Sequence, residues 1–308
     1  MKMSLHLVPR SLQYIEQVAQ LGSIQAASRK LGISASAIHR QIKSLEDDVG
    51  AILFERDGKG MTLTTSGRLV LDLARDWRLD NARLRTMIQD NEGIERGQIR
   101  IAAMDSMVNG FIPEMVQEIE RLYPLIKVDI NITSPDGATK GVLNGEFDLV
   151  VVANVTPHNN LKFHWSREFP LGCIAIPEHP VASKDRICFS EFVSHPVVFQ
   201  SAELTIRKLL EARHNWIFER VTKSTTVNSV QLMKLLVLSG HYIAVTSELD
   251  AGPEIQSNRL KFIPISDKDT FKQSISLVSN ELIPETATTQ KITSIAVRLL
   301  EDLTHFKN

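Results

Sequence analysis

One short stretch of the sequence gathers small residues and residues that donate hydrogen bonds. An apolar stripe at helical spacing runs through it, formed by Ile38, Ile42, Leu45 and Val49. The stripe predicts a helix with one buried side, which leaves the small and donor-bearing side chains on the other side. Such a helix fits the major groove of DNA, where arginine and histidine can donate to guanine acceptors or to phosphates. The predicted DNA-contacting residues are Ser34, Ala35, Ser36, His39, Arg40, Lys43 and, from the hairpin that follows, Arg56 and Lys59.

An enzyme whose helices carry a merely solvated basic face is the alternative. The sequence holds no GxSxG, HExxH, GxGxxG or P-loop motif, so we assign no catalytic residue. Its two cysteines, Cys173 and Cys188, lie among apolar neighbours, form no CxxC pair and occur without clustered histidines. They indicate core positions rather than a disulfide or a metal site. We therefore expect no metal and no cofactor.

The elements around the donor-rich helix predict a helix-turn-helix with a wing. A first helix follows Pro9 and ends at Gly22, and a second helix, 24–31, begins after the capping residue Ser23 and ends at Gly32. Ser34 caps the third helix, which Gly50 ends. Two short alternating segments, 52–56 and 61–64, surround a glycine-rich turn and predict a β-hairpin.

A long helix is expected from Thr65 to about Asn91, because this stretch has no proline and only one glycine. Its apolar residues recur at heptad-like spacing, interrupted by Asp80 and Asn81; they are Val70, Leu73, Trp77, Leu84 and Met87 or Ile88. One apolar seam on a long exposed helix predicts pairing with a second copy, although packing on the body of its own chain is the alternative. Residues 92–97 break the pattern and predict a hinge.

The rest of the chain alternates strands with helices, which favours a parallel sheet with crossover helices. The predicted strands are 99–103, 127–132, 148–152, 172–177, 196–200, 243–246 and 273–279, and the predicted helices are 112–122, 137–144, 230–239 and 289–303. The last strand and helix are expected to return to the first of two lobes.

Ligands of open α/β sheets bind beyond the carboxyl ends of strands, near helix N-termini. The residues at those positions are Met104, Asp105, Ser106, Ser134, Pro135, Asn154, Gln200, Asn228, Ser229 and Thr246. Their hydroxyls and the nearby helix N-termini suit a small polar or anionic effector. Asp105 would repel an anion, so we expect it either to cap the following helix or to hold an amino group.

Length, net charge and hydropathy limit the number of domains and the classes of protein that this sequence can represent. The 308 residues suggest two domains, and residues 1–68 carry a net charge of +3 against −4 for the remainder, a hint of an anionic partner for the head. No apolar run approaches the length of a transmembrane helix, and residues 1–10 lack the apolar stretch of a secretory signal. We expect a reduced, cytoplasmic setting without membrane contact.

Residues 12–75 resemble the N-terminal domain of LysR-type transcriptional regulators. The landmarks occur in order, among them Gly22-Ser23, Ala26-Ala27, Arg40-Gln41-Ile42, Leu53-Phe54-Glu55-Arg56 and Gly67. The segments RLYPLIKVDI, LNGEFDLVVV and MKLLVLSGHYIAV resemble, more loosely, the effector-binding domain of that family. Where the family commonly has Gln-Pro and then Ser, this chain has Ala35-Ser36 and His39. The operator preference is therefore expected to differ, and Arg40 is the most transferable contact.

The resemblance implies a winged helix-turn-helix over 1–66, a dimerising linker helix over 67–92 and an effector-binding domain over 93–308. The latter is expected to be a two-lobed α/β fold like a periplasmic binding protein, with lobe I at 98–160 and 270–308 and lobe II at 161–269. The partners implied are double-stranded DNA with a pseudo-palindromic operator, a second copy in a dimer or tetramer, a small-molecule effector, and possible contact with RNA polymerase. An effector-independent architectural DNA binder is the alternative within DNA binding.

Overall fold

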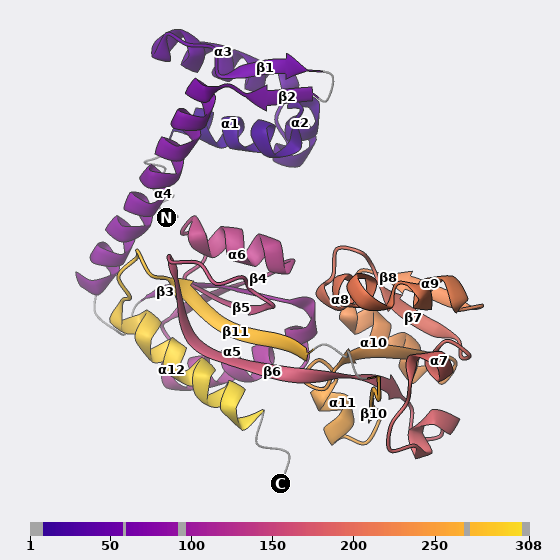
Figure 1. Ribbon diagram of the computed structural model, residues 1–308. Helices are drawn as coiled ribbons and strands as arrows, with labels where there is room; N and C mark the ends of the chain where they lie inside the picture. The colour runs from indigo at the N-terminus through magenta and orange to yellow at the C-terminus, as the bar shows by residue number, and fades with distance from the viewer. Residues whose placement is uncertain (1–8, 58–59, 92–96, 268–271, 304–308) are drawn as a thin grey trace. The chain divides into compact units, whose positions relative to one another are not determined.

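The computed structural model describes residues 9–57, 60–91, 97–267 and 272–303, which fall into two compact units. The first unit is Met1–Arg85 and the second is Thr86–Asn308. In Figure 1 the first unit is drawn in indigo and purple, and the second runs from purple to yellow. Each unit is described by itself.

Three helices form the core of the first unit: α1 (Arg10–Leu21), α2 (Ile24–Leu31) and α3 (Ala35–Val49). The Oγ atoms of Ser23 and Ser34 accept hydrogen bonds from the first turns of α2 and α3, which confirms both predicted caps. The inward side chains Ile15, Val18 and Ile38 are completely buried. The α3 stripe packs into this core at Ile38, Ile42 and, partly, Leu45, whereas Val49 in the last turn is 46% exposed, which corrects its predicted place.

The wing consists of β1 (Phe54–Asp57) and β2 (Gly60–Leu63), paired antiparallel. The first strand begins two residues later than predicted, because the carbonyl of Ile52 accepts a hydrogen bond from Thr64 Oγ1 at 2.7 Å instead of joining the ladder. The N–H of Met61 donates to the carbonyl of Gly22 at 2.8 Å, which ties the wing to the turn after α1.

The long helix α4 (Thr65–Asn91) has the predicted bounds. It starts where Thr64 Oγ1 accepts a hydrogen bond from the N–H of Gly67 at 3.0 Å. A Cβ atom at Gly67 would lie 2.2 Å from the carbonyl oxygen of Leu53, so only glycine allows this close approach of α4 to the wing. Val70 lies against the core of the first unit rather than on the exposed seam, which corrects its predicted place.

The second unit is built on a nine-stranded sheet in the order β4-β3-β5-β11-β6-β9-β7-β8, with β10 also paired to β6. The strands are β3 (Gln98–Ala103), β4 (Lys127–Ile132), β5 (Leu149–Ala153), β6 (Leu161–Ala175), β7 (Val197–Gln200), β8 (Ser224–Val227), β9 (Ile243–Ser247), β10 (Lys261–Pro264) and β11 (Lys272–Asn280). The first half of β6 pairs with β11 and its second half with β9 and β10. One continuous strand therefore runs through two lobes, as Figure 1 shows.

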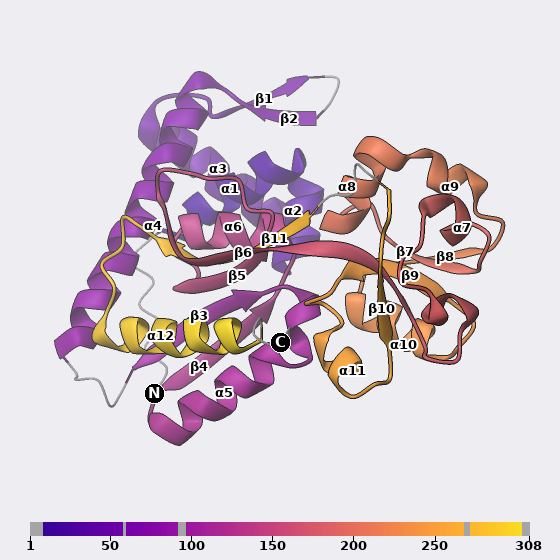
Figure 2. The same ribbon diagram turned by 60° about the horizontal axis from the view of Figure 1, so that its bottom comes forward.

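Helices cover both faces of each lobe. Lobe I carries α5 (Phe111–Leu122) and α12 (Ala287–Asp302) on one face of its strands and α6 (Pro135–Leu143) on the other (Figure 2). Lobe II packs α7 (Phe189–Phe192), α8 (Thr205–His214) and α9 (Trp216–Arg220) on one face. Its other face holds α10 (Val230–Leu238) and α11 (Gly252–Gln256). Two short 3₁₀ turns, η1 (Asp105–Val108) and η2 (Pro180–Ser183), complete the unit.

Some expectations for this unit are wrong. The sheet is mixed, because β6 and β11 run antiparallel to their neighbours while β3, β4 and β5 are parallel. The strand predicted at 172–177 is the end of β6, whose first half is largely exposed and shows no regular alternation. Helix α6 begins at Pro135 rather than at residue 137, because Ser134 Oγ caps it. Cys188 is only half-buried, at the start of α7, whereas Cys173 is fully buried.

The other predicted elements of this unit lie within two residues of their observed bounds. Eight elements among the described residues of this unit were not predicted, namely η1, η2, α7, α8, α9, β8, α11 and β10. Most of them are only four or five residues long, too short for hydrophobic periodicity to show.

We expect Gly67→Ala to destabilise the first unit by about 1–3 kcal/mol, since the new methyl group overlaps the Leu53 carbonyl. Thermal or urea unfolding of the purified protein measures this. Gly252→Ala is the matched control, because a Cβ atom there meets nothing within 4 Å. Equal stability of the two variants would contradict the close approach.

Candidate functional site

The outward face of α3 presents the donor-rich residues of the sequence prediction. Ser36, His39, Arg40 and Lys43 are exposed, whereas Ala35 is half-buried and packs on the core. Within the described part of the chain, Arg40 and His39 form no hydrogen bond or ion pair, and Lys43 lies 3.9 Å from exposed Asp47. The guanidinium and imidazole groups can therefore turn toward a ligand without breaking an internal contact.

The wing places a further cation beside this face. Arg56 is exposed on β1, opposite Met61 in the ladder. Lys59, also predicted to contact DNA, lies outside the described residues. Ser34, the remaining predicted contact, is exposed at the N-terminus of α3, where its Oγ accepts from the N–H of Ala37 at 3.3 Å.

A buried ion pair fixes the direction in which α4 leaves the first unit. The guanidinium of Arg78 on α4 donates to both carboxylate oxygens of Glu16 on α1, and both side chains are largely buried. On both sides of Arg78 along the chain, α4 exposes apolar side chains on one side of the helix: Leu73 is 46% exposed, Trp77 43% and Leu84 39%. Large apolar groups in this arrangement form a surface that another protein segment can cover.

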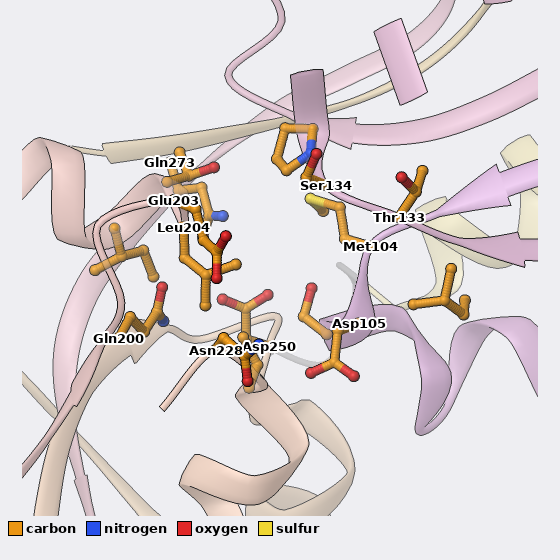
Figure 3. A pocket seen from close by; sticks show the side chains of 16 residues that line it. Met104, Asp105, Thr133, Ser134, Gln200, Glu203, Leu204, Asn228, Asp250 and Gln273 are labelled. Carbon is orange, nitrogen blue, oxygen red and sulfur yellow. The ribbon is translucent and has the colours of Figure 1, made fainter. Parts of the chain in front are cut away.

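A cavity of about 330 Å³ opens between the two lobes of the second unit. Figure 3 shows its walls: Met104, Asp105, Thr133 and Ser134 come from lobe I, and Gln200, Glu203, Leu204, Asn228 and Asp250 come from lobe II. Gln273 of β11 closes the side where the strands cross between the lobes. The volume suits a small organic molecule.

Seven of the ten residues predicted at strand ends line this cavity: Met104, Asp105, Ser106, Ser134, Pro135, Gln200 and Asn228. The other three, Asn154, Ser229 and Thr246, are not among its lining residues. Asn154 adopts a left-handed backbone, φ 47°, and its Oδ1 accepts from the N–H of Ser274. Ser229 caps α10, and the buried hydroxyl of Thr246 donates to Asp250 Oδ2 at 2.9 Å. The side chains of these three residues hydrogen-bond to neighbouring segments around the cavity instead of lining it.

Asp105 joins the lobes. Its Oδ2 accepts from the hydroxyl of Ser229 at 2.9 Å and from the N–H of Gln231 at 3.0 Å, so it caps α10 of the opposite lobe. The expectation that Asp105 caps the helix that follows it is therefore wrong. The amide of Gln231 donates back to the Asp105 carbonyl at 3.0 Å. A carboxylate at a helix N-terminus is favourable, because it meets unpaired N–H groups and the positive end of the dipole.

A buried charge network lies behind the cavity. The ammonium of Lys234, 1% exposed, donates to Glu254 Oε2 and to the backbone carbonyl of Asp250, both at 3.0 Å. The other Glu254 oxygen accepts from the amide of Asn109 in lobe I at 2.7 Å. Burial raises the pKa of Asp250, although nearby hydroxyls and the Lys234 charge oppose the shift.

Sequence reasoning missed five polar residues of the wall, namely Thr133, Glu203, Thr205, Asp250 and Gln273. Asp250 follows β9 by three residues, Gln273 lies near the start of β11, and Glu203 lies three residues beyond β7. Glu203 and Asp250 each lie within four residues of the end of a predicted strand, and Thr133 directly follows another, so the strand-end rule could have found them. Gln273 lies at the start of a predicted strand and Thr205 begins a helix that was not predicted, so local patterns do not place them at the cavity.

Comparison with known proteins agrees with this geometry. Residues 9–68 match the family described as "Bacterial regulatory helix-turn-helix protein, lysR family", and residues 92–297 match "LysR substrate binding domain". The RuBisCO operon transcriptional regulator of Allochromatium vinosum is 26% identical over 83% of this chain and 84% of its own length. The regulator YtlI of Bacillus subtilis is 27% identical, covering 88% and 87%.

Solved structures share the fold. A full-length OxyR variant from Pseudomonas aeruginosa superposes with a TM-score of 0.57 at 16% identity, covering 94% of this chain and 93% of that one. Full-length CbnR in complex with its target DNA gives a TM-score of 0.51 at 16% identity, covering 94% and 98%.

The chain belongs to the LysR family of transcriptional regulators. It is a DNA-binding regulator rather than an enzyme, and its second unit is a domain that binds a small-molecule effector. None of the described helices combines the length and apolar character needed to cross a membrane.

We expect Lys234→Met to lower the stability of the second unit by about 3–5 kcal/mol, because Glu254 is left buried with only the exposed Arg259, 4.0 Å away, as a counter-charge. Urea unfolding followed by fluorescence measures the loss. The double variant Lys234→Met with Glu254→Met is expected to recover most of it, since apolar groups of similar size replace the pair. A double variant no more stable than the single one would contradict this account.

Proposed function

We propose that the protein acts as a dimer that binds a pseudo-palindromic operator through two α3 helices and releases or reshapes this contact when a small molecule fills the interlobe cavity. The observation that carries the DNA part is the outward face of α3. Its polar side chains are exposed, while Ile38 and Ile42 on its opposite side are buried in its own unit. Helices of this kind read base edges from their N-terminal turns.

The contacts divide by chemistry. Arg40 is proposed to read a base, because a guanidinium matches the two acceptors of guanine. Ser34, Ser36, Lys43, Arg56 and Lys59 are proposed to contact phosphates or sugars, with His39 able to donate to either. Ala35 brings no hydrogen-bonding group but permits close approach of the backbone. Departures at 35, 36 and 39 support an operator preference of its own.

The exposed apolar side of α4 supports the proposed dimer. Leu73, Trp77, Leu84 and Ile88 are exposed at spacings that repeat along one side of the helix, which supports pairing with a second copy over the linker segment 67–92. A two-fold dimer presents two reading helices one DNA turn or a multiple apart, hence the two half-sites. We further propose a tetramer assembled through the second units, contact with RNA polymerase at the promoter, and a cytoplasmic location, where such a promoter lies.

The effector acts through the lobes. The cavity is lined from both sides, and the Asp105 contacts cross between them. A ligand shifts the equilibrium between lobe arrangements only by its difference in affinity for them. An architectural DNA binder without an effector is the second candidate. The cavity between the lobes and its polar lining argue against it.

We expect Arg40→Ala to weaken operator binding by about 1–3 kcal/mol and to relax specificity at one base pair, if it reads that base. Lys59→Ala should weaken binding to all sequences evenly and reduce the salt slope by about one. Gel-shift titration over a salt series measures both, with exposed Arg121→Ala on α5 as control. Unchanged affinity of both variants for DNA would contradict the proposal that α3 and the wing contact the operator.

We expect Leu84→Glu to dissociate the dimer, because a charge replaces an apolar group within the seam of α4. Sedimentation and binding to one or two half-sites measure this, with loss expected only for the paired sites. Arg75→Glu is the control: it adds the same side chain on the opposite side of α4 at an exposed position. Leu84→Glu behaving like Arg75→Glu would show that the seam does not pair.

A further inference from the structure

We propose that the effector carries a protonated nitrogen, an ammonium or amidinium group, which binds the Asp250 carboxylate inside the interlobe cavity. This inference rests on the proposed effector function of that cavity and names the chemical class of the molecule. It differs from the expectation of a small polar or anionic effector, and it places the amino-group contact at Asp250 rather than at Asp105.

Asp250 carries the argument. The residue is 1% exposed and lines the cavity, where Figure 3 shows its carboxylate facing the open space. Its Oδ2 accepts from Thr246, and Oδ1 receives no hydrogen bond of good geometry from the described residues, although the hydroxyls of Ser106 and Ser247 lie near the carboxylate. A buried acceptor without a donor is costly, and most of all when it belongs to a carboxylate. The missing partner is a donor, preferably a charged one.

The nearest buried cation does not supply that donor. The Lys234 ammonium gives its printed hydrogen bonds to Glu254 and to the backbone carbonyl of Asp250, not to its side chain. Glu254 already balances the charge of Lys234 at 3.0 Å. The Asp250 carboxylate is therefore left without a direct ion-pair contact of its own among the described residues. Burial raises its pKa, although the neighbouring hydroxyls and the more distant charge of Lys234 oppose the shift.

The other charged side chains of the described cavity wall are also negative. Glu203 is exposed at the rim, and Gln273, 4% exposed, has an Oε1 atom that no described group donates to. No lysine, arginine or histidine is among the lining residues that the structure describes. Asp105 is already satisfied at the N-terminus of α10. Asp250 and Glu203 thus leave the cavity negative.

Two competing readings are weaker. The N-terminus of α8, where Thr205 and Ile206 line the cavity, has no side-chain cap and favours an anion. Its dipole amounts to about half a positive charge, less than the full charge of one buried carboxylate. A metal ion is disfavoured because no three acidic, histidine or cysteine groups among the described residues are arranged to hold one. An organic cation with an acceptor at its far end satisfies both features.

Three four-carbon compounds that differ chiefly in charge test this on the full-length protein: putrescine, γ-aminobutyrate and succinate. Calorimetry and thermal unfolding measure binding at up to millimolar concentration. We expect putrescine, γ-aminobutyrate or both to bind and to raise the unfolding temperature, and succinate not to. γ-Aminobutyrate binding more tightly than putrescine would add the α8 N-terminus as a carboxylate site.

Variants locate the contact. Asp250→Asn keeps the shape and removes the charge, so we expect amine binding to fall at least about tenfold, equivalent to about 1.4 kcal/mol. Glu203→Gln, at the exposed rim, should weaken it about twofold to fivefold, and serves if the buried variant fails to fold. Glu120→Gln on the exposed side of α5 is the control that should change nothing.

Binding of succinate alone, or of no ammonium compound, overturns the proposal. So does amine binding that Asp250→Asn and Glu203→Gln leave unchanged. Operator binding by the unmodified protein is measured in parallel. If it persists and succinate alters it, the regulator function stands and only the cationic class is wrong. If no operator fragment binds, the proposed function itself fails.

Discussion

The ion pair between Lys234 and Glu254 is the constraint around which the second unit is arranged. Both side chains are buried at the junction of the lobes, where an unpaired charge would be intolerable. The pair is completed by Asn109 of lobe I and by the Asp250 backbone, so it links α10, α11 and the turn after η1. Because the ammonium is engaged there, the Asp250 side chain faces the cavity with its own charge unmatched. The ligand site is negatively charged because Lys234 pairs with Glu254 rather than with the Asp250 carboxylate.

The first unit also contains a buried ion pair at a junction between its elements. Glu16 and Arg78 sit between α1 and α4, and their bidentate contact sets the direction of the long helix. Small or absent side chains then allow close approach, as at Gly67 against the Leu53 carbonyl. The result holds α3 with its polar side outward and leaves the α4 seam exposed. DNA contact and pairing thus depend on one buried ion pair and a few tight backbone contacts.

Local chemistry explains why some features could be predicted from the sequence and others could not. Glycine and serine at 22, 23, 32, 34 and 50 mark helix ends by backbone freedom and capping, so the first unit could be predicted almost to the residue. Strand ends located seven of the sixteen described lining residues of the cavity, because the rule for α/β sheets depends only on topology. Gln273 could not be found this way. Its position depends on β6 and β11 crossing between the lobes, which is a long-range feature.

The charge of the cavity also bears on how a ligand bound between the lobes can influence the DNA-binding unit. In the lobe arrangement seen here, Asp105 is held by α10, and Asp250 and Glu203 face the same space. Unneutralised carboxylates disfavour closure of the lobes without a ligand, since approach brings like charges into a drier region. A cation between them changes the sign of that effect and favours closure. Its affinity therefore differs between open and closed arrangements, and that difference is the only quantity by which an effector can shift the regulator's state.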